Sequence, residues 1–198
     1  AKIKQSIEHQ AVVQADGSII DTVFVHRTHS GVAGVPLYGV NNVDYLRIYV
    51  PEGSELLEAG GFTFPPEDVF KIPEDWYKDD IDLAAQEREI GIHPQSGTRI
   101  TSEFGKNVFG NWLMVAPGNT ATAYFVYKLP FKADSRYSLL AQKQSGIDSD
   151  FTTQVIYPDG WSPVWSADDR MQLAANGASY SGVLDEDKVV GVVMKKNF

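Results

Sequence analysis

Hydrophobic and polar residues alternate along most of this chain, with a period of two residues. The stretch YLRIYV at residues 45–50 is the clearest β-prone run, with Arg47 among aromatic and aliphatic residues, and Pro51 and Gly53 follow it directly. Aromatic and β-branched residues fit the pleated, half-buried surface of a sheet. Proline has no N–H to donate to a neighbouring strand, so it ends a strand or lies at a sheet edge. The pattern therefore predicts a strand over residues 45–50 and a turn after it.

Short β-prone runs separated by turn residues recur along the whole chain. Asp16 and Gly17 lie between two such runs, residues 7–13 and 18–28, and Asp-Gly is a strong hairpin signal because glycine accepts a positive φ. Further strands are predicted at residues 54–59, 98–104, 109–115, 120–128, 137–144, 151–157, 162–166, 171–175, 178–184 and 188–194. Long helical patterns are absent, so we predict an all-β fold, an antiparallel β-sandwich.

Residues 63–97 interrupt this rhythm. They contain many acidic residues and prolines at positions 65, 66, 73 and 94. Short helical turns are predicted at residues 66–70 and 81–89, and Asp80 is placed to cap the second one. We interpret this segment as a mostly irregular, partly helical insertion in a β-rich chain.

One strand-and-turn pattern occurs twice. YVPEG at residues 49–53 and YPDGW at residues 157–161 are similar, and Arg27 and Lys143 occupy matching places before them. We therefore predict two tandem immunoglobulin-like units, residues 1–130 and 131–198, with the insertion at about 63–97 inside the first. The alternative is that β-proteins in general reuse the same turn residues.

Composition and charge narrow the classes of function. A hydrophobic content of 43%, with 4 Trp, 9 Tyr and 10 Phe, is typical of a folded globular chain. The net charge of −9 disfavours nucleic acid or an anionic membrane surface as a partner, because both require clustered lysine and arginine. The chain has no cysteine, which removes disulfides and thiolate metal sites. It has neither a run of about 18 apolar residues nor a signal peptide, so we expect a piece of a longer protein.

No sequence motif for catalysis or cofactor binding is present. The phosphate-binding patterns GxxxxGK[ST] and GxGxxG and the nucleophile elbow GxSxG do not occur. His26 and His29 are three residues apart, so on a strand they point to opposite faces, and we interpret them as surface or loop-flanking residues. We predict no catalytic residue, no cofactor site and no metal site. The catalytic alternative requires His93 or His29 to pair with a carboxylate in a polar cleft.

Acidic residues gather in several predicted turns. Aspartate is favoured in turns because its side chain bonds to the nearby backbone. A calcium ion held by carboxylates from several loops is the alternative, although no EF-hand spacing supports it. The residues concerned are Asp148, Asp150, Asp168, Asp169, Asp185, Glu186 and Asp187.

Aromatic side chains are the candidate ligand-binding residues. Trp161 and Trp165 lie four residues apart around a proline, and Trp76 and Tyr77 lie in the insertion. If these rings are exposed, they could stack on sugar rings; if they are buried, they anchor the core of a sandwich, which is the more common fate of tryptophan.

Several longer stretches carry a resemblance to a known family. They are DGS at residues 16–18, PLYG at 36–39, NVDYLRIYVPEGSELLEAGGF at 42–62, SGTRITSEFGKNVFGNWLMVAPGNTATAYFVYKLPF at 96–131 and YSLLAQKQSG at 137–146. Together they resemble the C-terminal region of the bacterial family called domain of unknown function 4012. The stretch YVPEGSELL also resembles a strand step of immunoglobulin-like repeats in bacterial surface proteins. The resemblance implies a parent protein anchored by an N-terminal transmembrane segment, export to the cell surface and a link with envelope polysaccharide. It implies no catalytic residues.

Taken together, these features predict a non-catalytic, extracytoplasmic surface module that acts as a scaffold or protein-interaction domain of a larger membrane-anchored protein. Its expected partner is a protein or polysaccharide of the cell envelope, with no nucleic acid and no membrane contact required by this part of the chain. A carbohydrate-binding module for envelope polysaccharide is the first alternative. An accessory part of an envelope hydrolase or transferase is the second.

Overall fold

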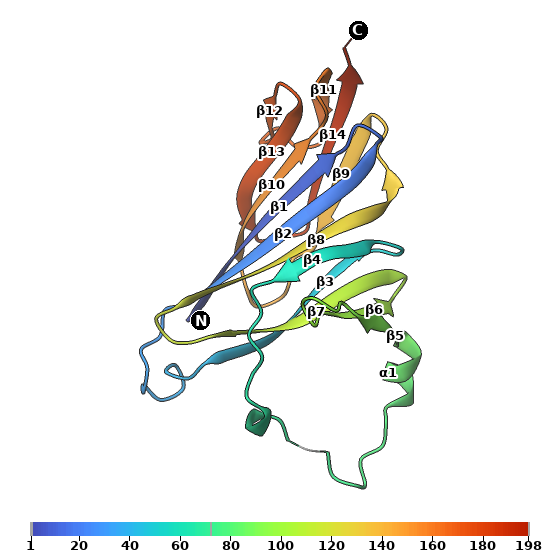
Figure 1. Ribbon diagram of the computed structural model, residues 1–198. Coiled ribbons are helices and arrows are strands. Elements are labelled where there is room, and N and C mark those ends of the chain that lie inside the picture. Colours follow the sequence, from blue (N-terminus) through green and yellow to red (C-terminus); the bar gives the residue numbers. More distant parts are fainter. Residues whose placement is uncertain (1, 72, 198) are drawn as a thin grey trace.

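The computed structural model describes residues 2–71 and 73–197, which form three sheets and two short helices (Figure 1). A seven-stranded sheet has the order β12 (Gln172–Ala174), β13 (Gly177–Leu184), β10 (Ser149–Ile156), β1 (Ile3–Val13), β2 (Ser18–His29), β8 (Thr120–Lys132) and β4 (Glu55–Gly60). A three-stranded sheet has the order β11 (Trp161–Ser166), β14 (Lys188–Lys196) and β9 (Arg136–Ala141). A four-stranded sheet has the order β3 (Asn42–Pro51), β7 (Lys106–Val115), β6 (Arg99–Glu103) and β5 (Glu87–Ile92).

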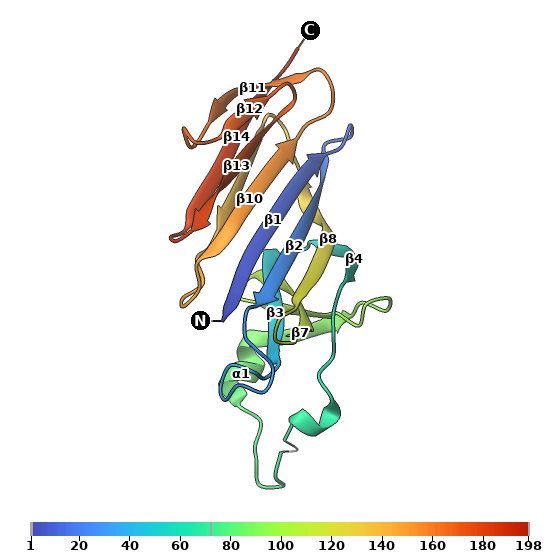
Figure 2. The same ribbon diagram turned by 90° about the vertical axis from the view of Figure 1, so that its left-hand side faces the viewer.

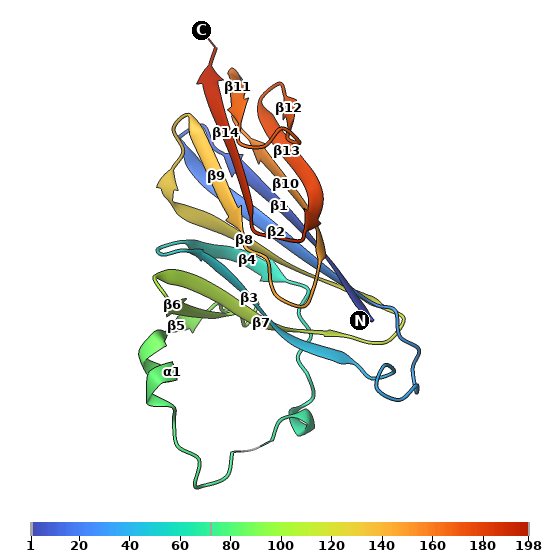
Figure 3. The same cartoon turned by 180° about the vertical axis from the view of Figure 1, so that it is seen from behind.

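The two smaller sheets pack against one face of the seven-stranded sheet. Figure 1 views the seven-stranded sheet from its other, outer face, and Figure 3 views the molecule from behind, with β9, β14 and β3 in front. The core lies between these layers and includes Phe125 of β8, Phe109 of β7 and Val192 of β14, none more than 1% exposed. The predicted all-β sandwich of antiparallel sheets is thereby confirmed.

The alternation of the sequence decides which face each strand buries. On β2, Ile19, Val23 and Val25 are buried, whereas Thr22 and Phe24 between them face outward. The hairpin between β1 and β2 forms at the predicted Asp-Gly turn. Asp16 Oδ1 accepts hydrogen bonds from the backbone N–H and hydroxyl of Ser18, at 3.0 and 2.7 Å, and these bonds lower the pKa of Asp16 to about 2.

Among the described strands, one neighbouring pair is parallel, and it joins the first strand of the chain to a strand 144 positions later. β1 pairs in parallel with β10, from Ser6 opposite Asp150 to Val12 opposite Ile156, as Figure 2 shows face-on. The predicted boundary between residues 130 and 131 lies inside β8, and the seven-stranded sheet contains strands from both sides of it. Strands from both predicted units therefore pair in one sheet. The division into two immunoglobulin-like units stays a prediction.

The insertion contains the predicted helical turns and one strand that was not predicted. η1 (Glu67–Val69) and α1 (Ile81–Gln86) form, and Asp80 Oδ1 caps α1 by accepting from the N–H groups of Asp82 and Leu83, as predicted. The helix predicted over residues 81–89 ends early, because β5 begins at Glu87 and pairs with β6. Arg99 of β6 holds this strand through Glu87 Oε1 at 2.6 Å and Glu89 Oε2 at 3.3 Å. None of the described helices is long and apolar enough to span a membrane.

Candidate functional site

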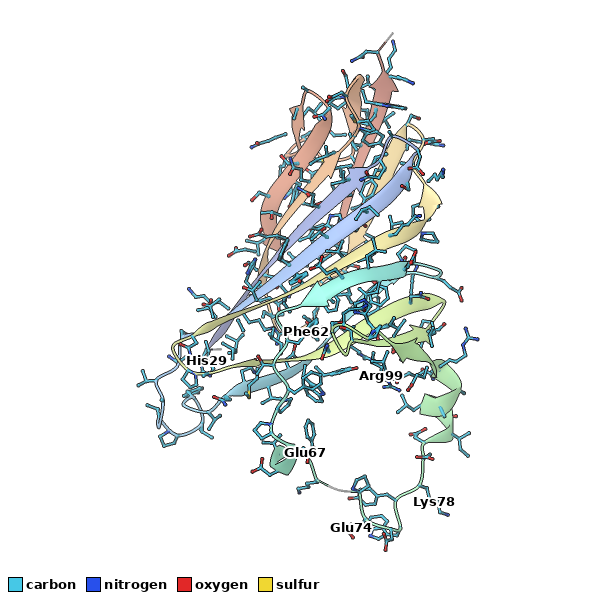
Figure 4. All side chains as sticks on the ribbon, in the orientation of Figure 1. His29, Phe62, Glu67, Glu74, Lys78 and Arg99 are labelled. Carbon is cyan, nitrogen blue, oxygen red and sulfur yellow. The ribbon has the colours of Figure 1, made fainter. Side chains whose placement is uncertain are left out.

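The segment that leaves the sandwich between β4 and β5 is the main candidate for an interaction site. Residues 66–71 and 73–86 are exposed throughout, and neither η1 nor α1 has a buried residue. We call residues 66–86 the outer loop. Figure 4 shows Glu67, Glu74 and Lys78 on this loop, well away from the sheets.

The outer loop combines large exposed hydrophobic side chains with a strong negative charge. Among its described residues, Trp76 is 70% exposed and Ile81 is 84% exposed. Val69, Phe70, Tyr77 and Leu83 are also exposed large hydrophobic residues. The loop contains seven carboxylates and two lysines, so its net charge is −5. Exposed apolar side chains concentrated in this way mark interaction surfaces in soluble proteins.

Few aromatic contacts hold the outer loop to the body of the protein. The Phe70 ring packs edge-on against Trp112 of β7, with 5.1 Å between the ring centroids. Trp112 packs in the same way against Tyr45 of β3, with 4.9 Å between the centroids. The ring centroids of Trp76 and Tyr77 lie 4.4 Å apart, and Trp76 Nε1 donates a hydrogen bond to Glu74 Oε2 at 2.6 Å. These last contacts are local, so they leave the Trp76 and Tyr77 rings available to a partner.

The four predicted ligand-binding rings do not form a single platform. Trp76 and Tyr77 lie at the end of the molecule with the outer loop, whereas β11, with Trp161 and Trp165, lies at the opposite end (Figure 1). Trp161 is half-buried against Tyr157 at 5.5 Å, but Trp165 is 55% exposed. The register of β11 shifts between Pro163 and Trp165, which separates the environments of two tryptophans that four-residue spacing would otherwise place on one face.

A cleft of about 630 Å³ lies over the inner face of the seven-stranded sheet, bordered by β3 and β9. Its polar end is built around Arg27, whose Nη1 lies 2.8 Å from Asp44 Oδ2 and whose Nε donates to Gln5 Oε1 at 2.9 Å. Lys143 also lines this cleft, and its Nζ lies 2.9 Å from Asp148 Oδ1. The two cations singled out in the sequence thus share one cleft, but carboxylates already balance their charges.

A buried polar cluster lies between the layers. His9 Nδ1 is 2.8 Å from Thr153 Oγ1, and His9 Nε2 is 3.4 Å from Asp21 Oδ2. The Tyr137 hydroxyl also donates to Asp21 Oδ2 at 3.4 Å. The order hydroxyl, imidazole, carboxylate is that of a nucleophile with its base. However, His9, Asp21 and Thr153 are each at most 6% exposed, so we interpret the cluster as structural.

The remaining histidines do not support the catalytic alternative. His29 Nε2 lies 3.0 Å from the Val40 carbonyl oxygen, and its Nδ1 accepts from the Gly31 N–H. His93 Nδ1 lies 2.8 Å from Ser96 Oγ. In the part of the chain that the structure describes, neither is paired with a carboxylate as that alternative required. His29 flanks a loop, as predicted, because it is the last residue of β2, but its side chain points inward and is only 5% exposed. His26, which faces outward, lies 3.4 Å from Glu8 Oε1.

Most of the acidic side chains in the predicted turns are paired within the protein. Asp168 pairs with Arg170, Asp185 and Glu186 pair with Lys188, and Asp187 accepts from the backbone N–H of Lys143. In residues 2–71 and 73–197, no group of three or more histidine, aspartate or glutamate side chains is arranged to hold a metal ion.

Comparisons with known proteins give no functional assignment. No family model matches the chain, and no curated protein matches it. Among solved structures, the chain is similar to a mutant M1 zinc metallopeptidase from Deinococcus radiodurans bound to a Tyr-Ser-Ala substrate. The TM-score is 0.40 and the identity 10%, over 98% of this chain and 42% of that chain. Yeast LTA4 hydrolase in complex with bestatin gives a TM-score of 0.39 and 10% identity, over 96% of this chain and 28% of that chain. The chain thus spans less than half of the length of these proteins, and similarity at this level supports no inference about activity.

Proposed function

We propose that this chain is a non-catalytic protein-interaction module whose partner binds the outer loop. The observation that carries the proposal is the exposure of Trp76, Tyr77 and Ile81 on a segment without a buried residue in either of its helices. A monomeric soluble protein rarely exposes so many large apolar side chains close together unless they form an interaction site.

The charge of the outer loop supports a particular partner chemistry. Seven carboxylates surround its apolar side chains, so a complementary surface is apolar at its centre and has lysine or arginine at its rim. We place this module outside the cytoplasm, in a larger membrane-anchored protein, on the basis of the sequence resemblance alone.

Photocrosslinking from the outer loop tests the proposal in the full-length protein. With a benzophenone amino acid in place of Trp76, irradiation of intact cells should yield one discrete crosslinked protein. The yield should fall when Glu74 and Asp75 are changed to lysine, because the partner surface is basic. Phe104, which is 73% exposed on the body of the protein, is the matched control position. Equal crosslinking at both positions, or none at position 76, would contradict the proposal.

Replacing residues 66–86 by a flexible Gly-Ser linker should leave the fold intact. The described residues of the segment are all exposed, so we expect the midpoint of thermal unfolding to change by less than about 2 °C. Circular dichroism measures this midpoint. A fall of more than about 10 °C would show that the outer loop belongs to the core and is not a docking segment.

A further inference from the structure

The outer face of the seven-stranded sheet, turned toward the viewer in Figure 1, carries a shallow trough of about 490 Å³ over β1, β2, β10, β12 and β13. It is distinct from the outer loop, which lies beyond β4 and the four-stranded sheet. Because side chains alternate between the two faces of each strand, polar residues of several neighbouring strands lie together on this outer face. Gln10, Gln154 and Gln172 are all exposed and come from three different strands, with serine and threonine hydroxyls of β2, β10 and β13 between them.

The trough has almost no net charge, in a chain whose net charge is −9. Its charged side chains are one carboxylate, Glu8, and one guanidinium, Arg170. Arg170 Nε is held by Asp168 Oδ1 at 3.0 Å, so its charge is already balanced. Among the described lining residues, an anion finds no unpaired cation, and a cation finds only Glu8, whose Oε1 lies 3.4 Å from His26 Nε2. The lining therefore selects neither charge.

The amides of the trough keep most of their hydrogen-bonding capacity. Gln10 and Gln154 lie opposite each other on the parallel strands β1 and β10, and Gln10 Nε2 donates to Gln154 Oε1 at 3.2 Å. Each amide has one acceptor oxygen and two N–H donors, so this bond leaves the Gln10 oxygen and the Gln154 N–H groups for a ligand. A ligand that matches this array has both donors and acceptors at short spacing, as adjacent hydroxyl groups do.

An aromatic wall borders the amides. The Phe24 ring is 37% exposed and lies 6.3 Å from His26, with an angle of 7° between the two rings. Tyr124 of β8 lies 5.9 Å from Phe24 and donates its hydroxyl to Glu58 at 2.7 Å. A pyranose ring has an apolar C–H face and a polar hydroxyl edge. Phe24 can cover the first while Gln10 and Gln154 bind the second.

We infer that this trough binds a neutral oligosaccharide, with a pyranose ring on Phe24 and its hydroxyl groups on Gln10 and Gln154. An apolar ligand would leave these amides and hydroxyls without partners, and a charged ligand would find no unpaired opposite charge of the kind that anchors it. The inference goes beyond the proposed interaction at the outer loop, because it uses other residues on another face.

Isothermal titration of the whole chain with cellohexaose, chitohexaose and mannohexaose tests the inference. We expect saturable binding to at least one of them, with little change between about 0.05 and about 0.5 M NaCl because the contacts are uncharged. Phe24→Ala and Gln154→Ala should each weaken binding at least tenfold. Both residues are exposed, so both variants should fold, and unchanged thermal unfolding verifies this.

Two controls separate this site from the alternatives. Trp76→Ala and Trp165→Ala should bind the same sugar as the wild type does, and so should the chain without the outer loop. Loss of binding in Trp165→Ala would instead place the site on β11 and overturn the inference. Failure of all three sugars to bind, or binding of polygalacturonate alone, would overturn it as well. Neither result would affect the crosslinking expected at Trp76.

Discussion

Raising the pH from 10 to 12 is expected to unfold the protein, because three buried tyrosines resist ionisation. Burial raises the pKa of Tyr157 to about 12. Burial, followed by the nearby Asp21 carboxylate, raises the pKa of Tyr127 and of Tyr137 well above the ordinary value of 10.0. In the unfolded chain these phenols ionise near pH 10, so stability is unaffected below that pH and falls as the pH rises above it.

The size of this effect is comparable with the stability of a typical domain. Tyr157 alone accounts for about 2 kcal/mol between pH 10 and 12, and Tyr127 and Tyr137 add to it. Native domains are stable by only about 5–15 kcal/mol. Tyrosinate absorbance and circular dichroism, recorded together, should show these tyrosines ionising only as the sheets unfold. Ionisation of all nine tyrosines with the circular dichroism unchanged would contradict this prediction.

Tyr157→Phe provides the matched control. No described residue bonds to the Tyr157 hydroxyl, which is buried, so its removal should stabilise the protein at neutral pH and delay alkaline unfolding. Tyr137→Phe should instead destabilise it by about 1–2 kcal/mol at neutral pH, because the hydroxyl that donates to Asp21 is lost.

Local alternation was sufficient to predict most of the strands, but it could not predict which strands would be neighbours. The hairpin at Gly17 is local, because its two strands are joined by the turn itself. The parallel pairing of β1 with β10 joins residues 144 positions apart, and alternation shows only which face of each strand is buried. The strand β5 was missed because the helix signal at residues 81–89 continued into it. Pairing with β6 and Arg99 overrode that local preference.

The sequence contained a signal for the buried polar cluster that was not used. Asp21 is in phase with Val23 and Val25 on β2, and His9 is in phase with Ala11 and Val13 on β1. A polar residue in the inward phase of an otherwise apolar alternation is expected to be buried and paired. By contrast, no local pattern indicates that Gln10 lies opposite Gln154, because that depends on the register between distant strands.

His9→Leu is expected to destabilise the fold by about 1–3 kcal/mol, the range found when a buried polar group loses a hydrogen-bond partner. Asp21 is only 2% exposed, and its Oδ2 lies 3.4 Å from His9 Nε2. Without the imidazole, the Tyr137 hydroxyl is the hydrogen-bond partner that remains to this oxygen among the described residues. Denaturant unfolding at neutral pH measures the loss. His26→Leu is the matched control, because His26 lies at the same distance from Glu8, whose side chain is 59% exposed. That pair should contribute less than about 1 kcal/mol.

A double-mutant cycle separates the pairing of His9 with Asp21 from the other contacts that the substitution removes. Asp21→Asn keeps the shape of the side chain but removes its charge, so we expect it to destabilise the fold by about 1–3 kcal/mol. Once that charge is gone, His9→Leu no longer leaves a buried carboxylate without its histidine partner. The double variant should therefore be more stable than the sum of the single effects predicts, by about 1–3 kcal/mol. The loss of the bond between His9 and Thr153 occurs with and without Asp21, so it cancels in the cycle. Additivity within about 0.5 kcal/mol would show that His9 and Asp21 are neighbours without being partners.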